Sequence, residues 1–178
     1  VAVATGGIGS IVLFAVMSFL AMREFMTLTE TSRADHAVLI LAFFIFGPIQ
    51  YLLVWVEWYG LFAILIPVYA FVAIPSRMAL GGDTVRILER TSTMQWGLMA
   101  CVYCVSHAPA LLMLQIPGRP GIGAILLFYL VLVAQINDVM QYVWGKMRGK
   151  HAIAPNVSPS KTWEGFIGGT LTAIVLGT

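Results

Sequence analysis

The sequence IGAILLFYLVLVAQINDVMQYV, residues 122–143, has one charged side chain, Asp138, among its 22 residues. A helix needs about 20 mainly apolar residues to cross the hydrocarbon core of a bilayer. Residues 144–163 follow, and there basic, polar, Gly and Pro residues gather at a density found nowhere else in the chain. We therefore predict a membrane-spanning helix that ends in a polar segment, with the rest of the chain as its scaffold.

The composition of the whole chain is typical of a membrane protein. Of its 178 residues, 60% are hydrophobic and 10% are charged, whereas a soluble domain normally has about 25% charged residues. The net charge is only +2 and no basic run is interleaved with aromatic residues, which excludes nucleic acid as a partner. These proportions indicate an integral membrane protein.

Further apolar runs predict further spans. We expect spans at residues 1–22, 37–56, 61–74, 96–116 and 122–143, with a sixth beginning at Phe166. The predicted fold class is therefore all-α, a polytopic transmembrane helix bundle of about five to six spans in a single integral membrane domain, residues 1–178. Residue 1 is not methionine and the last run is too short to cross a bilayer, so we expect the domain to be incomplete at both ends.

The segment 75–95 is predicted to be a polar connector. Gly81 and Gly82 favour a turn, and Asp83 or Thr84 could cap a short helix of residues 85–90 that rests on the lipid surface. Arg86 and Arg90 would share one face of that helix, where they could attract anionic lipid or serve only as charged anchors.

Basic residues are unevenly distributed between the connectors. Those after the first, third and fifth predicted spans hold nine of the ten Lys and Arg residues, and the other side holds only Arg119. Cytoplasmic loops carry the excess of Lys and Arg. We therefore expect these connectors, including a loop at 144–163, to face the cytoplasm, as in a protein of the inner (cytoplasmic) membrane.

Polar residues near the end of the 122–143 run share one face of the predicted helix. Gln135, Asn137, Asp138, Gln141 and Tyr142 recur at spacings of 3, 4 and 7. A carboxylate inside a membrane is costly, so Asp138 is expected to face a cavity and a partner. This stripe predicts either a metal or phosphate site at Asp138 or an interfacial Asp paired with a nearby Lys.

The sequence GKMRGK, residues 145–150, predicts a flexible basic loop. Its exposed backbone N–H groups and the cations of Lys146 and Lys150 could hold phosphate oxygens. It is not a Walker A motif, because three residues rather than four separate Gly145 from Gly149, and His151 follows Lys150. The alternative is a loop that only anchors the chain by positive charge.

The next motif is SPSKTWEG, residues 158–165, which is typical of a helix start. Ser158 is predicted to be the N-cap and Pro159 the first helical residue. The amides of Ser160 and Lys161 would then lie at a helix N-terminus, which favours phosphate. A well-capped helix without any ligand is the alternative.

Side chains further along the motif could add to such a site. The hydroxyl of Thr162 would supply a donor, and Glu164 could pair with Lys161 or orient a metal-bound water. Gly165 and Gly169 are four residues apart, and Gly168 enlarges this small surface, so the helix can approach a neighbour closely.

Residues 137–169 as a whole resemble the phosphatidate cytidylyltransferase (CDP-diacylglycerol synthase) family, in which Asn-Asp near a span end precedes a Gly-Lys loop and an SPxKTWEG motif with a following Gly pair. The family also has, further toward the C-terminus, a Lys-Asp pair, a Pro-Gly-His-Gly-Gly-like turn and an Asp-Arg-x-Asp motif. None of these occurs in this sequence, so we expect either a truncated chain or one that is not active by itself.

The resemblance implies transfer of a cytidylyl group from CTP to phosphatidate, giving CDP-diacylglycerol and pyrophosphate. It implies Lys161, Asp138 and Glu164 as catalytic residues, with Asp138 as the Mg²⁺ ligand. The expected substrate-binding residues are Asn137, Gln141, Tyr142, Lys146, Lys150, Ser158, Ser160 and Thr162.

Other functions stay open on the sequence. A CTP-dependent polyprenol or phytol kinase would also need a polar pocket on a helix bundle, and a transporter or scaffold would need no turnover. CTP, phosphatidate and membrane lipids are the expected partners, and a homodimer is compatible with the sequence.

Overall fold

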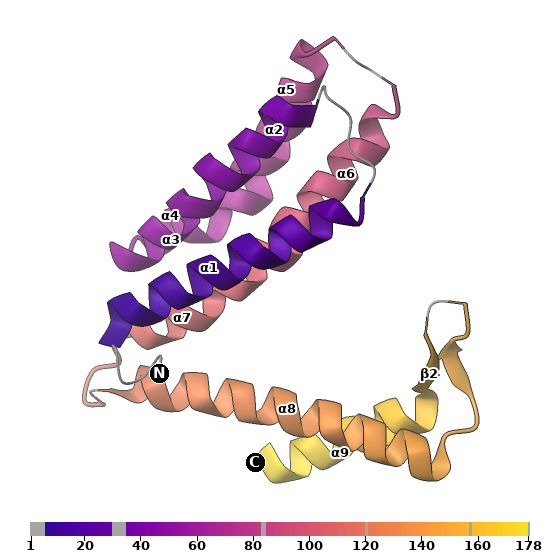
Figure 1. Cartoon of the computed structure of the whole chain (residues 1–178). Helices are drawn as coiled ribbons and strands as arrows, with labels where there is room; N and C mark the ends of the chain where they lie inside the picture. Colours follow the sequence, from indigo (N-terminus) through magenta and orange to yellow (C-terminus); the bar gives the residue numbers. More distant parts are fainter. Residues whose placement is uncertain (1–5, 30–34, 83–84, 120, 157, 178) are drawn as a thin grey trace. The chain divides into compact units, whose positions relative to one another are not determined.

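The structure, a computed structural model, describes residues 6–29, 35–82, 85–119, 121–156 and 158–177. It divides into two compact units, Val1–Ala124 and Ile125–Thr178, and each is described by itself. Five helices in the described residues are long and apolar enough to cross a membrane, so the predicted all-α polytopic bundle is confirmed (Figure 1). The prediction of one membrane domain over residues 1–178 stays a prediction.

Four long helices that run side by side make up the first unit (Figure 1). The first is α1 (Gly6–Thr27), and each of the other three contains a π-helical segment between two α-helical segments. Their segments are α2 (His36–Ile40), η2 (Leu41–Phe46) and α3 (Gly47–Trp55), then α4 (Tyr59–Ile64), η3 (Leu65–Ala70) and α5 (Phe71–Leu80), then α6 (Ile87–Gly97), η4 (Leu98–Cys104) and α7 (Val105–Met113).

The predicted second span, 37–56, is confirmed by the helix His36–Trp55. The first helix continues to Thr27, past the predicted end at Met22, and its predicted first five residues lie outside the described part of the chain. The predicted third span was too short, because the helix Tyr59–Leu80 runs six residues beyond Ile74 and contains Pro75.

Pro75 is tolerated inside its helix because a neighbouring helix replaces the hydrogen bond that it removes. A proline has no N–H, so the carbonyl four residues earlier loses its donor. That carbonyl belongs to Phe71, and it accepts a hydrogen bond from Nε2 of Gln95 at 2.9 Å. The side chain of α6 thus satisfies the backbone of α5.

Pro67, in η3, is supported in the same way from two other helices. Its missing N–H would donate to the carbonyl four residues earlier, Ala63, in an α-helix, or to the one five residues earlier, Phe62, in a π-helix. The hydroxyl of Tyr103 donates to the Ala63 carbonyl at 2.9 Å. Nε2 of Gln50, a side chain with no exposed surface, donates to the Phe62 carbonyl at 3.2 Å.

The predicted polar connector at 75–95 is much shorter in the structure. It comprises residues 81–86, since α5 ends at Leu80 and α6 begins at Ile87. The predicted turn at Gly81 and Gly82 is confirmed, with Gly82 at φ 77°. The separate surface helix at 85–90 is wrong, because residues 87–90 begin the fourth long helix, and the predicted caps Asp83 and Thr84 lie outside the described residues.

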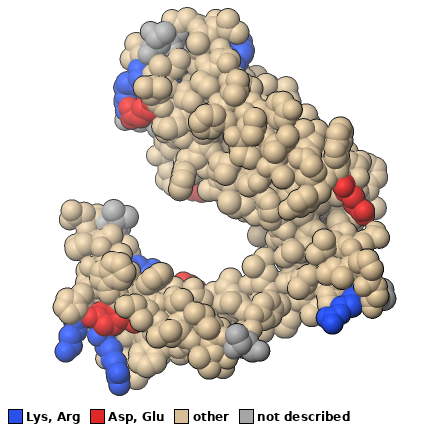
Figure 2. Space-filling view, turned by 180° about the vertical axis from the view of Figure 1, so that it is seen from behind, with Lys and Arg blue, Asp and Glu red and all other residues tan. Residues whose placement is uncertain are grey.

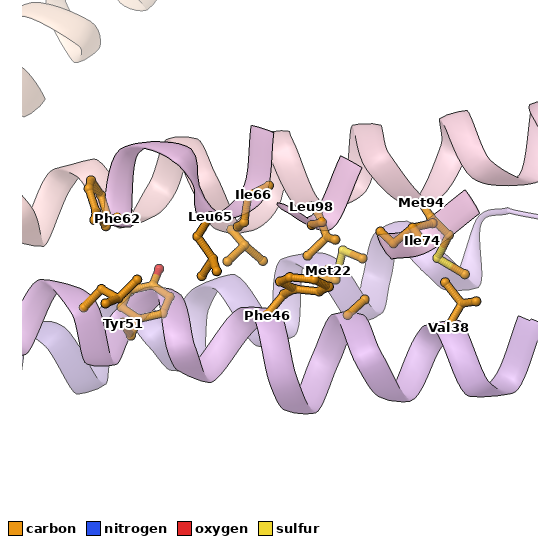
Figure 3. Packing of buried hydrophobic residues seen from close by; sticks show 14 of the residues in the cluster. Met22, Val38, Phe46, Tyr51, Phe62, Leu65, Ile66, Ile74, Met94 and Leu98 are labelled. Atoms are coloured by element: carbon orange, nitrogen blue, oxygen red, sulfur yellow. The ribbon is translucent and has the colours of Figure 1, made fainter. Parts of the chain in front are cut away.

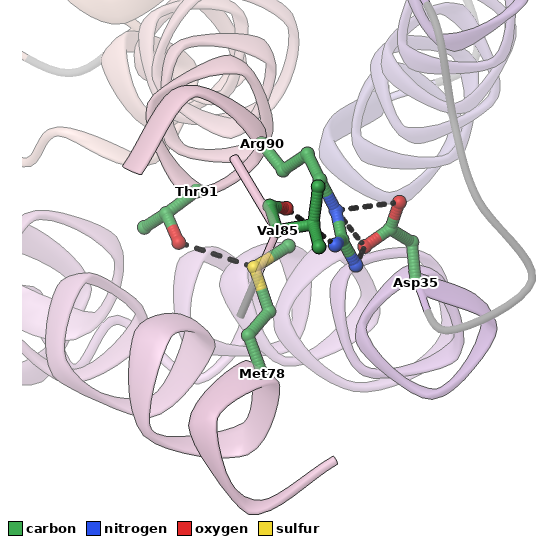
Figure 4. A network of polar contacts seen from close by, with 5 residues as sticks. All are labelled: Asp35, Met78, Val85, Arg90 and Thr91. Atoms are coloured by element: carbon green, nitrogen blue, oxygen red, sulfur yellow. Dashed lines mark hydrogen bonds and ion pairs between the residues drawn. The ribbon is translucent and has the colours of Figure 1, made fainter. Parts of the chain in front are cut away.

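Arg86 and Arg90 are each paired with a carboxylate, and their attraction of anionic lipid stays a prediction. Arg86 pairs with exposed Glu89. Nε of Arg90 donates to both carboxylate oxygens of Asp35, at 2.9 and 3.2 Å, and Arg90 also donates to the Val85 carbonyl (Figure 4). Asp35 is buried, and removing one partner of a buried ion pair typically costs about 3 to 5 kcal/mol.

The four helices of the first unit enclose its hydrophobic core. Met22, Val38, Phe62 and Leu98 each have almost no exposed surface and come from the four long helices, one from each (Figure 3). Many large apolar side chains on the outer faces are exposed, as expected where lipid replaces water. On the face seen in Figure 2, charged side chains lie at the ends of the helices and the surfaces between them are uncharged.

The second unit consists of a long helix, a β-hairpin and a shorter apolar helix. Helix α8 (Ile122–Arg148) extends beyond the predicted end at Val143, and its residues from Ile125 onward belong to this unit. Strands β1 (Ala152–Ala154) and β2 (Ser158–Thr162) pair antiparallel, with Ala152 opposite Thr162 and Ala154 opposite Ser158. Helix α9 (Trp163–Gly177) follows directly.

The support of Pro75 by Gln95 predicts a coupled pair of substitutions. Gln95→Leu should lower the free energy of unfolding by about 1 kcal/mol, because the Phe71 carbonyl loses its donor in an apolar surrounding. In a Pro75→Ala background the new N–H replaces that donor, so Gln95→Leu should cost less. A double-mutant cycle of unfolding free energies in detergent or bilayer measures the coupling, with Gln115→Leu in the exposed connector as control. Equal costs in both backgrounds would contradict the assigned contact.

Candidate functional site

Glycine residues bring α8 and α9 into direct contact in the second unit. A Cβ atom on Gly165 would lie 2.8 Å from the carbonyl oxygen of Gln141. A Cβ atom on Gly169 would lie 2.6 Å from the backbone nitrogen of Gln141. One on Gly168 would lie 2.5 Å from the ring of Trp144. Real Cβ atoms essentially never come that close, so the predicted close approach of this helix to a neighbour is confirmed.

A polar contact fixes the same crossing further along. Nε1 of Trp144 donates to the hydroxyl of Thr172 at 3.0 Å, and that hydroxyl donates to the Gly168 carbonyl at 2.7 Å. Gln141 and Trp144 of α8 are therefore held against α9.

The motif SPSKTWEG starts as a strand and not as a helix. Ser158 is paired in the hairpin opposite Ala154, and α9 begins at Trp163. Thr162 is the residue that caps the helix, because its hydroxyl accepts the N–H of Gly165 at 3.2 Å. The predicted N-cap at Ser158 is wrong, and so is the expected position of the Ser160 and Lys161 amides at a helix N-terminus.

The reason for the difference lies outside the motif. The N–H of Trp163 donates to the carbonyl of His151 at 2.9 Å, which pairs the residues before α9 with those after α8. Pro159 is compatible with the extended backbone of an edge strand. Ser158–Thr162 therefore forms a strand that pairs with Ala152–Ala154.

A pocket of about 370 Å³ lies where α8, the hairpin and α9 meet. Its volume falls within the range of about 300 to 1,000 Å³ that is usual for small-molecule sites. Six of the predicted site residues line it: Gln141, Tyr142, Lys146, Ser160, Lys161 and Thr162. Gly145, Ile153, Gly165 and Phe166 complete the wall.

Lys161 is the cation that the hairpin contributes to this pocket. Its Nζ lies 3.8 Å from Oδ1 of Asp138 on α8, and both side chains are more than half exposed. An exposed pair at this distance contributes about 0 to 1 kcal/mol to stability. The structure thus pairs Lys161 with Asp138 and not with Glu164, and Lys161 can leave its partner for a phosphate at little cost.

Lys146 is the second cation of the pocket and lies on the last turn of α8. Its Nζ is 3.4 Å from the Tyr142 hydroxyl and 5.7 Å from the centre of that ring. A cation over an aromatic face gains about 0.5 to 1 kcal/mol when exposed. Tyr142, four residues before Lys146 on α8, therefore holds the Lys146 side chain along the pocket wall.

The predicted basic loop at 145–150 is largely helical, since α8 continues through Arg148. Lys146 and Arg148 lie at the helix C-terminus, where positive charge is favourable. The backbone N–H groups of Lys150 and His151, which were expected to be open to phosphate, both donate to Oε2 of Glu164 at 3.1 and 3.2 Å. A carboxylate of the protein already occupies this anion-binding position.

Glu164 is anchored further by His151, whose Nδ1 lies 2.6 Å from Oε1. The contact to His151, followed by those to the amides of Lys150 and His151, lowers the pKa of Glu164 from 4.5 to about 2. Glu164 is therefore ionised at any physiological pH, and it ties the start of the hairpin to the first turn of α9. Its predicted catalytic role stays a prediction.

The remaining predicted residues lie beside the pocket and not in its wall. Ser158 belongs to the hairpin, Lys150 is exposed at its base, and Asn137 is on α8. Among the residues that the sequence interpretation missed, Ile153 and Phe166 line the pocket and His151 holds Glu164. Apolar residues in an apolar chain carry no signal of a site, and His151 showed none until the fold placed it beside Glu164.

The residues around Asp138 fit a hard cation only in part. Within the described ranges, no cluster of three or more His, Cys, Asp and Glu side chains could hold a metal. Oxygen donors are nevertheless present, because the Asp138 carboxylate is exposed and Oδ1 of neighbouring Asn137 is buried with no hydrogen-bond partner there. Mg²⁺ is commonly held by one or two carboxylates with substrate phosphates and water, so Asp138 can supply one ligand of such a set.

The chain is similar to known membrane enzymes. The family model described as the Cytidylyltransferase family matches residues 1–178. The uncharacterized protein YnbB of Escherichia coli (strain K12) is 37% identical over 162 residues, which are 91% of this chain and 52% of that protein. The chain therefore spans about half the length of this relative.

Shorter matches are named phosphatidate cytidylyltransferase. That of Mycobacterium leprae (strain TN) is 36% identical over 107 residues, 58% of this chain and 33% of that protein. That of Haemophilus influenzae (strain ATCC 51907 / DSM 11121 / KW20 / Rd) is 46% identical over 57 residues, 32% of this chain and 20% of that protein. No solved structure matches.

The anchored carboxylate of Glu164 predicts a titration at unusually low pH. Its pKa is lower in the folded chain than the ordinary 4.5, so its stabilising contribution is full above about pH 4.5 and is lost as the pH falls toward about 2. A ¹³C NMR titration of the Glu164 carboxyl group should show a midpoint near 2. The midpoint should rise in His151→Ala and stay in His36→Ala, and a wild-type midpoint near 4.5 would contradict the contact.

Proposed function

The chain belongs to the cytidylyltransferase family, and we propose that it carries part of the site at which a cytidylyl group passes from CTP to phosphatidate, giving CDP-diacylglycerol and pyrophosphate. The observation that supports this proposal most is the pocket in which Lys146 and Lys161 converge with the hydroxyl groups of Tyr142, Ser160 and Thr162. Two cations and three hydroxyls suit a chain of phosphates better than an uncharged ligand.

The chemistry asks little of the protein beyond position and charge. An anionic phosphate oxygen of phosphatidate attacks the α-phosphorus of CTP, a new P–O bond forms, and the bond from that phosphorus to the bridging oxygen of pyrophosphate breaks. The nucleophile is already ionised, so no general base is required. Catalysis then depends on aligning two anions and on neutralising the charge that gathers on the leaving pyrophosphate.

Lys161 and Lys146 are the residues that we assign to this neutralisation. They reach the pocket from β2 and α8 respectively, so a phosphate chain between them would be contacted from two sides. Asp138, 3.8 Å from Lys161, would position that lysine when no phosphate is present. Glu164 holds the hairpin in place and would act through Lys161, as a positioning residue.

Mg²⁺ is part of the proposal. Asp138 would hold the ion together with substrate phosphates and water. When bound, Mg²⁺ would neutralise phosphate oxygens and orient the leaving group.

We also propose that this pocket faces the cytoplasm from the inner membrane, because the connectors on its predicted side hold nine of the ten basic residues. Single cysteines at exposed Leu28 and Gln115, introduced after removal of Cys101 and Cys104, should react from the cytoplasmic and the outer side respectively. The reverse pattern would contradict this orientation.

The first prediction from the proposal concerns Lys161 in the protein at its full natural length. Lys161→Met should lower kcat about 10² to 10³-fold, because one donor to the developing charge is lost at the transition state. CTP binding should weaken less. Lys161→Arg keeps the charge but changes its geometry, and Arg77→Met, which removes an exposed cation from the first unit, is the control expected to keep wild-type turnover.

The same assay distinguishes the proposed reaction from the alternatives. CTP labelled at the α-phosphorus should transfer its label to the lipid, whereas CTP labelled at the γ-phosphorus should release labelled pyrophosphate. A lipid kinase would transfer the γ label, and a transporter or scaffold would transfer neither. Wild-type kcat in Lys161→Met at saturating CTP would remove this residue from the mechanism.

The second prediction concerns Asp138. Asp138→Asn should abolish Mg²⁺-dependent turnover and leave the fold intact, since the amide keeps the shape of the side chain but lacks the charge that a hard cation needs. Turnover measured over a Mg²⁺ series, with Glu57→Gln as a control for the loss of one exposed carboxylate, tests this. An unchanged Mg²⁺ dependence would leave Asp138 as an ordinary partner of Lys161.

A further inference from the structure

The first unit contains a cavity of about 170 Å³ between α1, η2, α3 and η4. Ser18 and Met22 of α1, Phe43 of η2, Gly47 and Tyr51 of α3, and Val102 of η4 are among its lining residues. All belong to the four-helix unit, and none takes part in the proposed function.

The two hydroxyl groups at this cavity are satisfied by the protein itself. The Tyr51 hydroxyl donates to the carbonyl of Phe14 at 3.0 Å, and it lies 2.5 Å from the hydroxyl of Ser18. Ser18 can therefore donate to Tyr51, which leaves both hydrogen atoms used. Apart from these groups the wall named above is apolar, so the cavity offers little to a polar ligand or to water, which needs two to four polar partners.

The cavity coincides with irregularities in two of the helices that surround it. Phe43 lies in the π-helix η2 and Val102 in the π-helix η4. A π-helical turn contains an extra residue and changes how its helix packs, and such turns occur frequently at functional sites. The cavity therefore lies where two of the surrounding helices depart from α-helical geometry.

The depth of the cavity identifies what can reach it. Ser18 is nine residues before the end of α1 and twelve after its start, or about 14 and 18 Å along a helix. The hydrocarbon core of a bilayer is about 30 Å thick, so the cavity lies near its middle, where acyl chains end. Phe19, 43% exposed, and Pro48, also exposed, lie at its rim, so the cavity opens toward lipid.

From these observations we propose that the cavity binds the terminal part of an acyl chain of a membrane lipid. Lipid tails are as apolar as leucine, so no hydrophobic gain drives the chain inward. The gain comes instead from dispersion contacts, which the lining of a cavity makes only when an apolar group fills it. An engineered apolar cavity of about 150 Å³ binds benzene or xenon, so this one accommodates a short hydrocarbon segment.

The headgroup of that lipid is not recognised, because no headgroup reaches the middle of the bilayer. The ligand class is therefore a glycerophospholipid chain of any headgroup, taken from the surrounding membrane.

Photolabelling of the chain in phosphatidylethanolamine and phosphatidylglycerol vesicles tests the proposal. Phosphatidylcholine with a diazirine at the end of one acyl chain should label Ser18, Met22 or Phe43, as mapped by peptide mass spectrometry. The same lipid with its diazirine beside the headgroup should not label them. Phe44, which is 66% exposed on the outer face, reports chain-end contact with surrounding lipid outside the cavity.

Filling the cavity provides the matched variant. A Cβ on Gly47 would meet only the Ala42 carbonyl, at an ordinary 3.5 Å, so Gly47→Leu can extend into the space; Val102→Phe fills it from the opposite helix. Both substitutions should abolish chain-end labelling of Ser18, Met22 and Phe43. Neither should lower Tm or change the labelling of Phe44. Gly60→Leu adds the same side chain at an exposed position away from the cavity. It should change neither the labelling at the cavity nor Tm.

Three results with phosphatidylcholine would overturn the proposal. They are absence of chain-end labelling at the cavity in the wild-type chain, equal labelling by the headgroup-proximal probe, and undiminished labelling in both folded filling variants. A phosphatidate analogue with the same chain-end diazirine should label the cavity as well as phosphatidylcholine does. Labelling by phosphatidate alone would contradict a site that recognises the chain and not the headgroup.

Discussion

The need to satisfy every backbone carbonyl inside an apolar span governs this structure more than any other constraint. A carbonyl without a donor in hydrocarbon costs several kcal/mol, yet Pro67 and Pro75 each remove one donor from within a span. Side chains of neighbouring helices replace them, as Tyr103 does for Ala63 and Gln95 for Phe71. Gln50, Gln95 and Tyr103 are therefore structural partners of these prolines, and their contacts join neighbouring helices.

Helix packing in the second unit depends on the opposite property, the absence of side chains. Gly165, Gly168 and Gly169 let α9 approach α8 so closely that Gln141 and Trp144 contact its backbone positions. This approach places the end of β2 beside the last turns of α8, and it brings Lys161 and Lys146 to one pocket although they are 15 residues apart. The proposed phosphate site is thus a consequence of how two helices pack.

Two kinds of binding space follow from these two modes of packing. Where glycine allows close contact, the polar chain segments beyond the helix ends converge, and cations with hydroxyl groups line the result. Where π-helical turns alter the spacing of helices in the first unit, an apolar space remains near the middle of the spans. One space is lined by cations and hydroxyl groups, and the other is lined mainly by apolar groups.

The sequence alone determined that the chain is a helical membrane bundle, because a span is set by length and apolarity, which are local properties. It also indicated residues 137–169 as the place of the proposed site and predicted the glycine contact within it, since polar residues and regularly spaced glycines are conspicuous in an apolar chain. Tertiary structure decided the rest. SPSKT became a strand because Trp163 pairs with His151, and Glu164 turned to His151 and the amides around it instead of Lys161. Pro75 stayed inside a helix because Gln95, 20 residues away in sequence, supplies the missing donor. Each of these outcomes depends on a partner that no local pattern specifies.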